Sequence, residues 1–142
     1  MDTLHGLFYG FSVALQPGNL TLVLAGCLLG TLIGVLPGIG PVGAISILLP
    51  VTFHMPPTGA VIMLAGIYYG AMYGGSMTSI LANVPGETAS VMTCLDGYQM
   101  ARQGRAGAAL GIAVFGSFIV GTVGLLGLIF IAEPLAALAL QF

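Results

Sequence analysis

A group of polar side chains ends a long apolar region of this sequence. No Lys, Arg, Asp or Glu occurs between Asp2 and Glu87. The apolar region closes with YGGSMTSILANVPGE, residues 73–87, in which hydroxyl and amide side chains precede a Pro-Gly pair and a carboxylate. Hydroxyl and amide groups can donate hydrogen bonds to a carboxylate, and their oxygens can ligate a hard cation such as Na⁺. The candidate binding residues in this region are Ser76, Thr78, Ser79, Asn83, Gly86, Glu87 and Thr88.

A second Pro-Gly break occurs earlier, at LPGIGP, residues 36–41. Such a segment does not sustain a helix, because Pro lacks an N–H and Gly is too flexible. In lipid, the unpaired backbone groups of a break are tolerated only inside protein or along a water-filled cavity. Secondary transporters bind anionic substrates and coupling cations at breaks of this kind. We therefore add Gly38 and Gly40 to the candidate residues.

The coupling ion predicted for such a site is Na⁺ or H⁺, and the sequence leaves the choice open. The best candidates for a Na⁺ site are Ser79 and Asn83, whose side-chain oxygens suit a hard cation. No other cofactor is predicted.

These residues also have structural explanations. A Ser or Thr in a membrane helix commonly bonds to a carbonyl of its own helix or of a neighbour, which is the favoured explanation for any single hydroxyl here. The cluster beside a break favours a binding site. Glu87 can equally carry a proton or cation or face water, and Asp96 is expected to face water in a loop. Thr88 can also cap a helix that begins near Ala89.

Two enzyme motifs are excluded. GIGPVG, residues 38–43, matches the dinucleotide pattern, which requires a βαβ unit and an acidic residue about 20 positions on. No acidic residue lies between Pro41 and Gly86. GGSMTS suggests a serine hydrolase, but a nucleophilic Ser76 needs a His or Lys base. The chain has no Lys, and both His residues lie near predicted membrane edges, so we predict no enzyme.

The composition shows the environment of these residues. Charged residues make up 4% of the chain and hydrophobic residues 58%, whereas a soluble domain is about 25% charged. We therefore predict a polytopic protein in a lipid bilayer, with no nucleic-acid partner. Runs such as LTLVLAGCLLGTLIGVL lack the alternation of barrel strands, so the predicted fold class is all-α.

The apolar pattern divides into segments. The amphipathic segment at 3–16 is too short to span, so we expect it to lie in the membrane interface. The remaining predicted segments are a span at about 20–36, a break at 37–41, a half-length segment at 42–53, a span at 59–82, a break and polar loop at 83–105, and a span at 106–131 that ends before Glu133-Pro134. Arg102 and Arg105 place the polar loop in the cytoplasm by the positive-inside rule.

Glycines recur every four residues along the first two predicted spans. Small-residue stripes of this kind let membrane helices approach backbone to backbone. We therefore predict that both stripes are packing faces. They consist of Gly26, Gly30, Gly34 and Gly38 in the first span and of Gly66, Gly70 and Gly74 in the second.

Three long strings resemble the large permease subunit of the tripartite tricarboxylate transporter family, the TctA family. They are GTLIGVLPGIGP (30–41), LAGIYYGAMYGGSMTSILANVPGE (64–87) and DGYQMARQGRAGAALG (96–111). The chain departs from the family pattern at Thr88, Gln99 and Glu133. Only Thr88 bears on the shape of a break.

The resemblance implies a multi-pass protein of the bacterial inner membrane. It implies ion-gradient-driven uptake of carboxylates such as citrate, with a small membrane subunit and a periplasmic solute-binding protein as partners. Family members are much longer, so the resemblance also implies that this is the N-terminal portion of a permease. The rest of the permease is then expected to supply partner helices for the glycine stripes.

Two hypotheses of different kinds follow. In the first, the chain belongs to a carboxylate permease, and its two breaks share a substrate and cation site near the middle of the membrane. In the second, it is a non-transporting scaffold that docks a partner through the polar loop and the glycine stripes. The pair of breaks favours the first hypothesis, because a scaffold does not need them.

Overall fold

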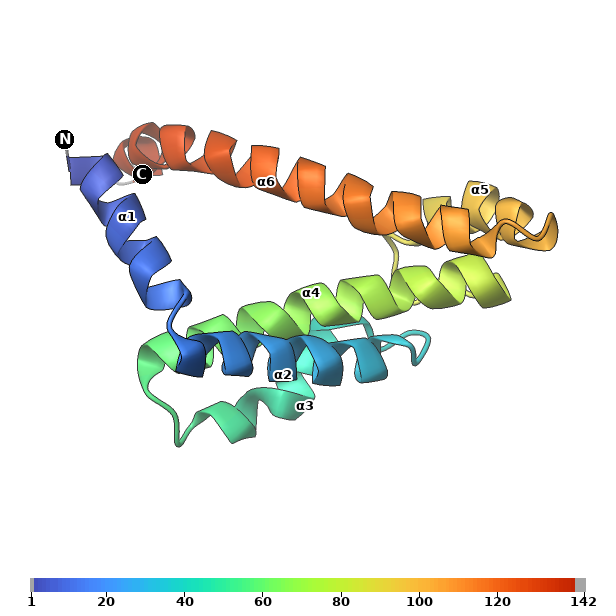
Figure 1. Cartoon of the computed structure of the whole chain (residues 1–142), viewed down its shortest axis with the longest axis horizontal. Helices are drawn as coiled ribbons and strands as arrows, with labels where there is room; N and C mark the ends of the chain where they lie inside the picture. The colour runs from blue at the N-terminus through green and yellow to red at the C-terminus, as the bar shows by residue number, and fades with distance from the viewer. Residues whose placement is uncertain (1, 140–142) are drawn as a thin grey trace.

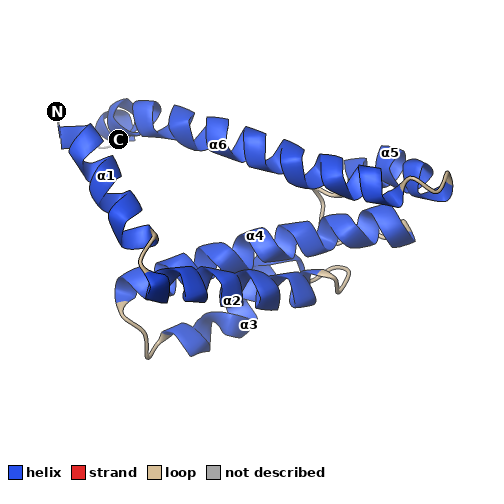
Figure 2. Ribbon diagram, in the orientation of Figure 1, coloured by secondary structure: helices blue, strands red, loops and turns tan. Residues whose placement is uncertain are grey.

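The protein is built from helices joined by short turns (Figures 1 and 2). The computed structural model describes residues 2–139, and no strand occurs within that range. The predicted all-α class is therefore confirmed. The helices are α1 (Asp2–Ala14), α2 (Pro17–Gly34), α3 (Gly40–Thr52), α4 (Pro57–Ala82), α5 (Val91–Arg102) and α6 (Ala106–Ala139).

Three of these helices are long and apolar enough to cross a membrane: α2, α4 and residues 106–129 of α6. The helix α3 is shorter. Its 13 residues span about 20 Å at 1.5 Å per residue, whereas the hydrocarbon core of a bilayer is about 30 Å thick. The helix α1 has 13 residues and exposes Phe8, Tyr9 and Phe11. Its location in the membrane interface stays a prediction.

Proline and asparagine mark the ends of the central helices. Pro17 and Pro57 occupy the first positions of α2 and α4, where a missing N–H removes no helical hydrogen bond. The helix α4 ends at Asn83, which adopts the left-handed conformation with φ 57° and ψ 31°. Asn tolerates this conformation better than most non-Gly residues. The backbone N–H of Val84 then bonds to the carbonyl of Thr78 at 3.4 Å and closes the helix.

The helices α2 and α4 lie side by side and form the centre of the fold (Figure 1). Each helix places glycines against backbone carbonyls of the other, so that a Cβ at any of these glycines would overlap a carbonyl oxygen. Because the paired positions rise together along both chains, the two helices run parallel. The pairs are Gly26 with Met63, Gly30 with Ile67, Gly34 with Ala71, Gly66 with Val23, Gly70 with Cys27 and Gly74 with Thr31.

The predicted glycine packing faces are therefore found in the structure, but their expected partner was wrong. The two stripes pack on each other within this chain and do not require helices from elsewhere. Gly38 also falls outside the stripe, because α2 ends at Gly34 and Gly38 lies in a turn with φ 87°. Glycines recur every four residues in both helices, and this common spacing lets α2 and α4 pack against each other along their length.

The buried core adjoins this contact. It consists of Ala44 from α3 and Met63, Ile67 and Ala71 from α4. The short helix α3 thus packs against α4 while returning the chain toward the start of α4, as parallel α2 and α4 require.

Two segments differ from the sequence-based expectations. The polar region 83–105 contains the helix α5, whose Gly97 is buried against the side chain of Ile80. Gly97 therefore serves the packing of α5 against α4. The helix α6 continues through Glu133-Pro134 to Ala139 and does not end before them. A Pro in a membrane helix removes one backbone bond but does not have to end the helix.

The helix α6 contacts α5 and α4 near its start and then diverges from α4 (Figure 1). Ala109 is buried near the start of α6, whereas no residue from 110 to 129 is buried. A Cβ on Gly111 or Gly116 would meet no atom within 4 Å. These glycines therefore differ physically from those of α2 and α4, although the sequence pattern is similar.

This difference predicts opposite responses to alanine. Gly70→Ala places a methyl group on the carbonyl of Cys27, and overpacking of this kind destabilises by about 1–3 kcal/mol. Gly116→Ala meets open space and should be neutral or stabilising, because Ala favours a helix over Gly by about 1 kcal/mol. Thermal unfolding of the purified protein in detergent, followed by circular dichroism, measures both. Equal midpoints for the two variants would contradict the glycine–carbonyl contact.

Candidate functional site

The two helix breaks meet in the folded chain. The N–H of Gly38, in the turn after α2, donates a hydrogen bond of 3.1 Å to the carbonyl of Gly86, in the loop after α4. A Cβ on Gly40 would lie 3.7 Å from the Cβ of Glu87. The two breaks, which are distant in the sequence, are therefore in contact in the structure.

The course of the second break explains this meeting. After Asn83 turns the chain, the loop folds back along α4 until Gly86 lies against Gly75. A Cβ on Gly75 would lie 3.5 Å from the Cα of Gly86, and Gly86 is buried. The lack of a side chain at both positions therefore lets the loop reach the end of α2.

An open cleft of about 520 Å³ lies where the breaks meet. Ligand sites for small organic molecules are typically about 300–1,000 Å³. One wall comes from the first break and the start of α3, and the other from the second break and the start of α5. The lining residues are Gly38, Ile39, Gly40, Pro41, Val42, Pro85, Gly86, Glu87, Thr88 and Val91.

The first wall combines two glycines with the apolar residues Ile39, Pro41 and Val42. Gly38 and Gly40 have φ of 87° and 61°, values that strain a residue with a side chain. The helix α3 begins at Gly40, and the first N–H groups of any helix have no intrahelical partner. The N–H groups of Gly40 and Val42 therefore lie at the positive end of the α3 dipole, beside the cleft.

The second wall carries the carboxyl group of Glu87, which is partly buried. Burial raises the pKa of this carboxyl above its ordinary value. Partial removal of the carboxyl from water is the cause of this shift. The structure therefore favours a protonated Glu87 more than water does.

The structure places the three predicted hydroxyl residues of α4 outside the cleft lining. The hydroxyl of Ser76 donates to the carbonyl of Met72 at 3.1 Å. Those of Thr78 and Ser79 donate to the carbonyl of Gly75 at 2.9 Å and 2.8 Å. These bonds match the structural explanation weighed from the sequence. Their role as substrate ligands stays a prediction.

The two residues proposed for Na⁺ have different surroundings. Ser79 is fully buried, whereas Asn83 is exposed at the end of α4, and neither lines the cleft. The left-handed turn accounts for Asn at position 83 on structural grounds. Within the described residues, no group of three or more His, Cys, Asp or Glu side chains could hold a metal ion. The Na⁺ site stays a prediction.

The start of α5 corrects one sequence-based alternative. Thr88 lies exposed in the cleft wall and does not cap a helix at Ala89, because α5 begins at Val91 after Ser90. Ser90 is 2% exposed, and its hydroxyl bonds to the backbone of Glu87. Sequence analysis missed this residue as a candidate, although a Ser directly before a helix is a usual signal of local backbone bonding.

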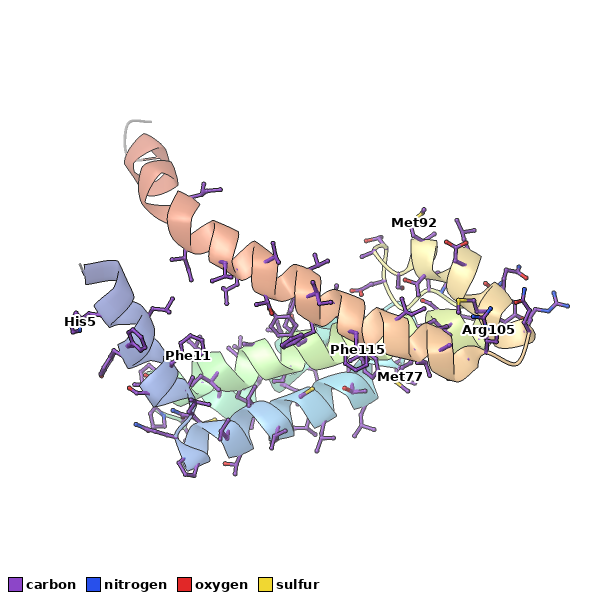
Figure 3. All side chains as sticks on the ribbon, turned by 45° about the horizontal axis from the view of Figure 1, so that its top comes forward. His5, Phe11, Met77, Met92, Arg105 and Phe115 are labelled. Carbon is purple, nitrogen blue, oxygen red and sulfur yellow. The ribbon has the colours of Figure 1, made fainter. Side chains whose placement is uncertain are left out.

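Three other charged residues, Asp96, Arg102 and Arg105, lie on α5 or in the turn directly after it. Asp96 is exposed and borders a second, mostly apolar cavity of about 340 Å³ between α4, α5 and α6. Figure 3 shows Arg105 at the turn between α5 and α6, at the end of the molecule remote from His5 of α1. Neither Asp96 nor Arg105 lines the cleft between the breaks.

Comparison with known proteins identifies the family. The model described as the tripartite tricarboxylate transporter TctA family matches residues 20–142, which include both breaks and the whole cleft lining. The chain belongs to this family. The resemblance found in the sequence is confirmed, and the family is one of transporters.

A relative of this TctA-family chain in Agrobacterium vitis is 56% identical over 142 residues. It is described as an uncharacterized 52.8 kDa protein in the TAR-I ttuC' 3' region. The alignment covers 100% of this chain but 28% of the relative, so the chain spans little more than a quarter of that protein's length. No solved structure matches the chain.

The raised pKa of Glu87 predicts a pH-dependent stability. The contribution of this carboxyl is fully present below the pKa of the unfolded chain and is lost as the pH rises through the higher folded pKa. The unaltered protein should therefore lose stability over this window relative to Glu87→Gln. Thermal unfolding in detergent from acidic to neutral pH measures the difference. Asp96→Asn, which removes an exposed carboxyl on α5, is the control. Parallel pH profiles for the unaltered protein and Glu87→Gln would contradict the burial effect.

Proposed function

We propose that this chain is part of a membrane permease for small carboxylates and that the cleft between the breaks forms part of its substrate site. The observation that carries the proposal is the meeting of two helix breaks at one open cleft, in a chain with three helices apolar enough to cross a membrane. Membership in a tricarboxylate transporter family supports the same assignment.

The physical argument begins with the cost of a break in lipid. Unpaired backbone groups are tolerated at membrane depth where protein buries them or where they line a water-filled cavity. Here one backbone bond joins the two breaks, and the remaining backbone of residues 38–42 borders the cleft. Breaks that persist in this form are better explained by a binding site than by helix packing.

The substrate class follows from the charge of the first wall. The N–H groups at the start of α3 and its positive dipole end favour an anionic group. The positive-φ backbone at Gly38 and Gly40 allows close approach, because neither residue has a side chain. A carboxylate of the substrate is proposed to bind at this wall.

The charge of Glu87 would also affect the binding of an anionic substrate in the cleft. An ionised Glu87 would repel a substrate carboxylate in the same cleft, so binding requires a proton on Glu87 or a cation beside it. The carboxyl is partly desolvated, which favours the proton. We propose that the coupling ion, H⁺ or Na⁺, neutralises Glu87 when the substrate binds.

The proposed setting is the bacterial inner membrane. The permease would receive its substrate from a periplasmic solute-binding protein and would assemble with a small membrane subunit, as a tripartite system implies. A scaffold that only docks a partner is less well supported, because neither the cleft nor Glu87 is needed for docking. Replacing each Pro-Gly pair with Ala-Leu should be tolerated by a scaffold.

Uptake of radiolabelled citrate tests the proposal in cells that express the full-length permease with both partner subunits. Glu87→Gln and Gly40→Ala should each reduce uptake at least tenfold, equivalent to about 1.4 kcal/mol, at unchanged membrane levels. Gly116→Ala, in an unpacked part of α6, is the matched control. Normal uptake by both cleft variants would overturn the site assignment. Uptake of another carboxylate but not citrate would overturn citrate as the substrate.

The coupling ion is tested in the same cells. Uptake that requires a sodium gradient would support Na⁺, and uptake that follows the pH gradient without sodium would support H⁺. Ser79→Ala and Asn83→Ala test the sequence-based Na⁺ ligands. If these residues hold Na⁺, each substitution should abolish sodium-dependent uptake while membrane levels stay normal. Normal sodium dependence in both variants would exclude them.

A further inference from the structure

We infer that Ser90 is a positioning residue that holds the two helix breaks together by fixing the orientation of the peptide group between Gly86 and Glu87. Its effect on transport rests on the proposed function of the cleft. Its effect on the backbone does not.

The hydroxyl of Ser90 engages Glu87 on both sides. The N–H of Glu87 donates to the Ser90 Oγ at 3.2 Å, and the Ser90 hydroxyl donates to the carbonyl of Glu87 at 2.9 Å. The N–H of Ser90 also donates to that carbonyl at 3.2 Å. Without the hydroxyl, the carbonyl of Glu87 keeps one donor, whereas the N–H of Glu87 loses the acceptor that the structure gives it.

The N–H of Glu87 belongs to the same peptide group as the carbonyl of Gly86. That carbonyl accepts the 3.1 Å hydrogen bond from the N–H of Gly38, which joins the breaks. Because a peptide group is planar, fixing its N–H also fixes the direction of its carbonyl. Ser90 binds the N–H at one edge of this peptide group and thereby orients the carbonyl at the opposite edge, which accepts the bond from Gly38.

The residues around this peptide group do not fix its orientation by themselves. Gly86 has no side chain and can adopt many backbone conformations. It is buried against the backbone of Gly75, which restricts its position but provides it with no hydrogen bond in the structure. The Ser90 hydroxyl is the side-chain group that bonds to the backbone of Glu87.

Ser90 does not act as a ligand itself. It is 2% exposed and is absent from the cleft lining, which contains Glu87 and Thr88 from the same loop. Its hydroxyl proton is already donated to Glu87. Its influence on the cleft passes through Glu87 and Gly38, which both line the cleft.

Hydrogen exchange of the full-length permease in detergent, measured by mass spectrometry, tests the inference without a substrate. Ser90→Ala should accelerate amide exchange at least tenfold in peptides covering residues 36–40 and 85–88. Exchange within α2 and α4 should stay unchanged. Ser90→Thr keeps the hydroxyl and should restore slow exchange in both breaks. Ser12→Ala, which removes an exposed hydroxyl bonded to the carbonyl of Tyr9, is the matched control.

Citrate uptake forms the second arm and is measured with both partner subunits present. Ser90→Ala should raise the KM at least fivefold at unchanged membrane levels, and Ser90→Thr should stay near the unaltered protein. Unchanged exchange at residues 36–40 in Ser90→Ala would overturn the inference, as would faster exchange throughout α2 and α4. Faster exchange confined to both breaks, together with normal uptake by every cleft variant, would support the role of Ser90 and overturn the proposed function.

Discussion

The contact between glycine and backbone carbonyl along α2 and α4 is the constraint on which the rest of the structure depends. Apolar attraction between helices is weak in lipid, because lipid tails are as apolar as the side chains, so association relies on close packing. Six glycines provide it here, three from each helix. Their shared spacing of four residues also fixes the register. Once Gly34 lies at Ala71 and Gly74 at Thr31, the end of α2 is set beside the last third of α4.

This register creates the site. The helix α4 extends well past the end of α2, and the loop after Asn83 returns along it to Gly75. The first break therefore meets the second at the side of α4. Parallel α2 and α4 also require the chain to travel back between them, and α3 does so. The same demand places the start of α3, with its unpaired N–H groups, at the cleft. A packing rule for two helices thus determines where the cleft forms.

Sequence reasoning anticipated the three spans, the breaks and the packing faces, because each depends on local chemistry, but it predicted a loop where α5 forms. Pro-Gly pairs stop helices, and glycine stripes permit close approach, wherever they occur. It failed where the outcome depends on which surfaces meet. The stripes of α2 and α4 are paired while Gly111 and Gly116 of α6 remain open, although all are apolar helices rich in glycine. The hydroxyls of Ser76 and Ser79 donate to carbonyls of their own helix, which is the explanation that the sequence favours for any single hydroxyl, and their role as ligands stays a prediction. Ser90 was not among the candidate residues, since its contacts with the backbone of Glu87 depend on a fold that the sequence does not display.

The return of the second break along α4 also determines how deep the cleft lies. From Gly75 to the end of α4 at Ala82 the helix rises about 10 Å. Glu87 lies at the level of Gly75 and not at the tip of the helix. The carboxyl group of Glu87 therefore lies about two helical turns back from the tip of α4, at the level where α2 ends.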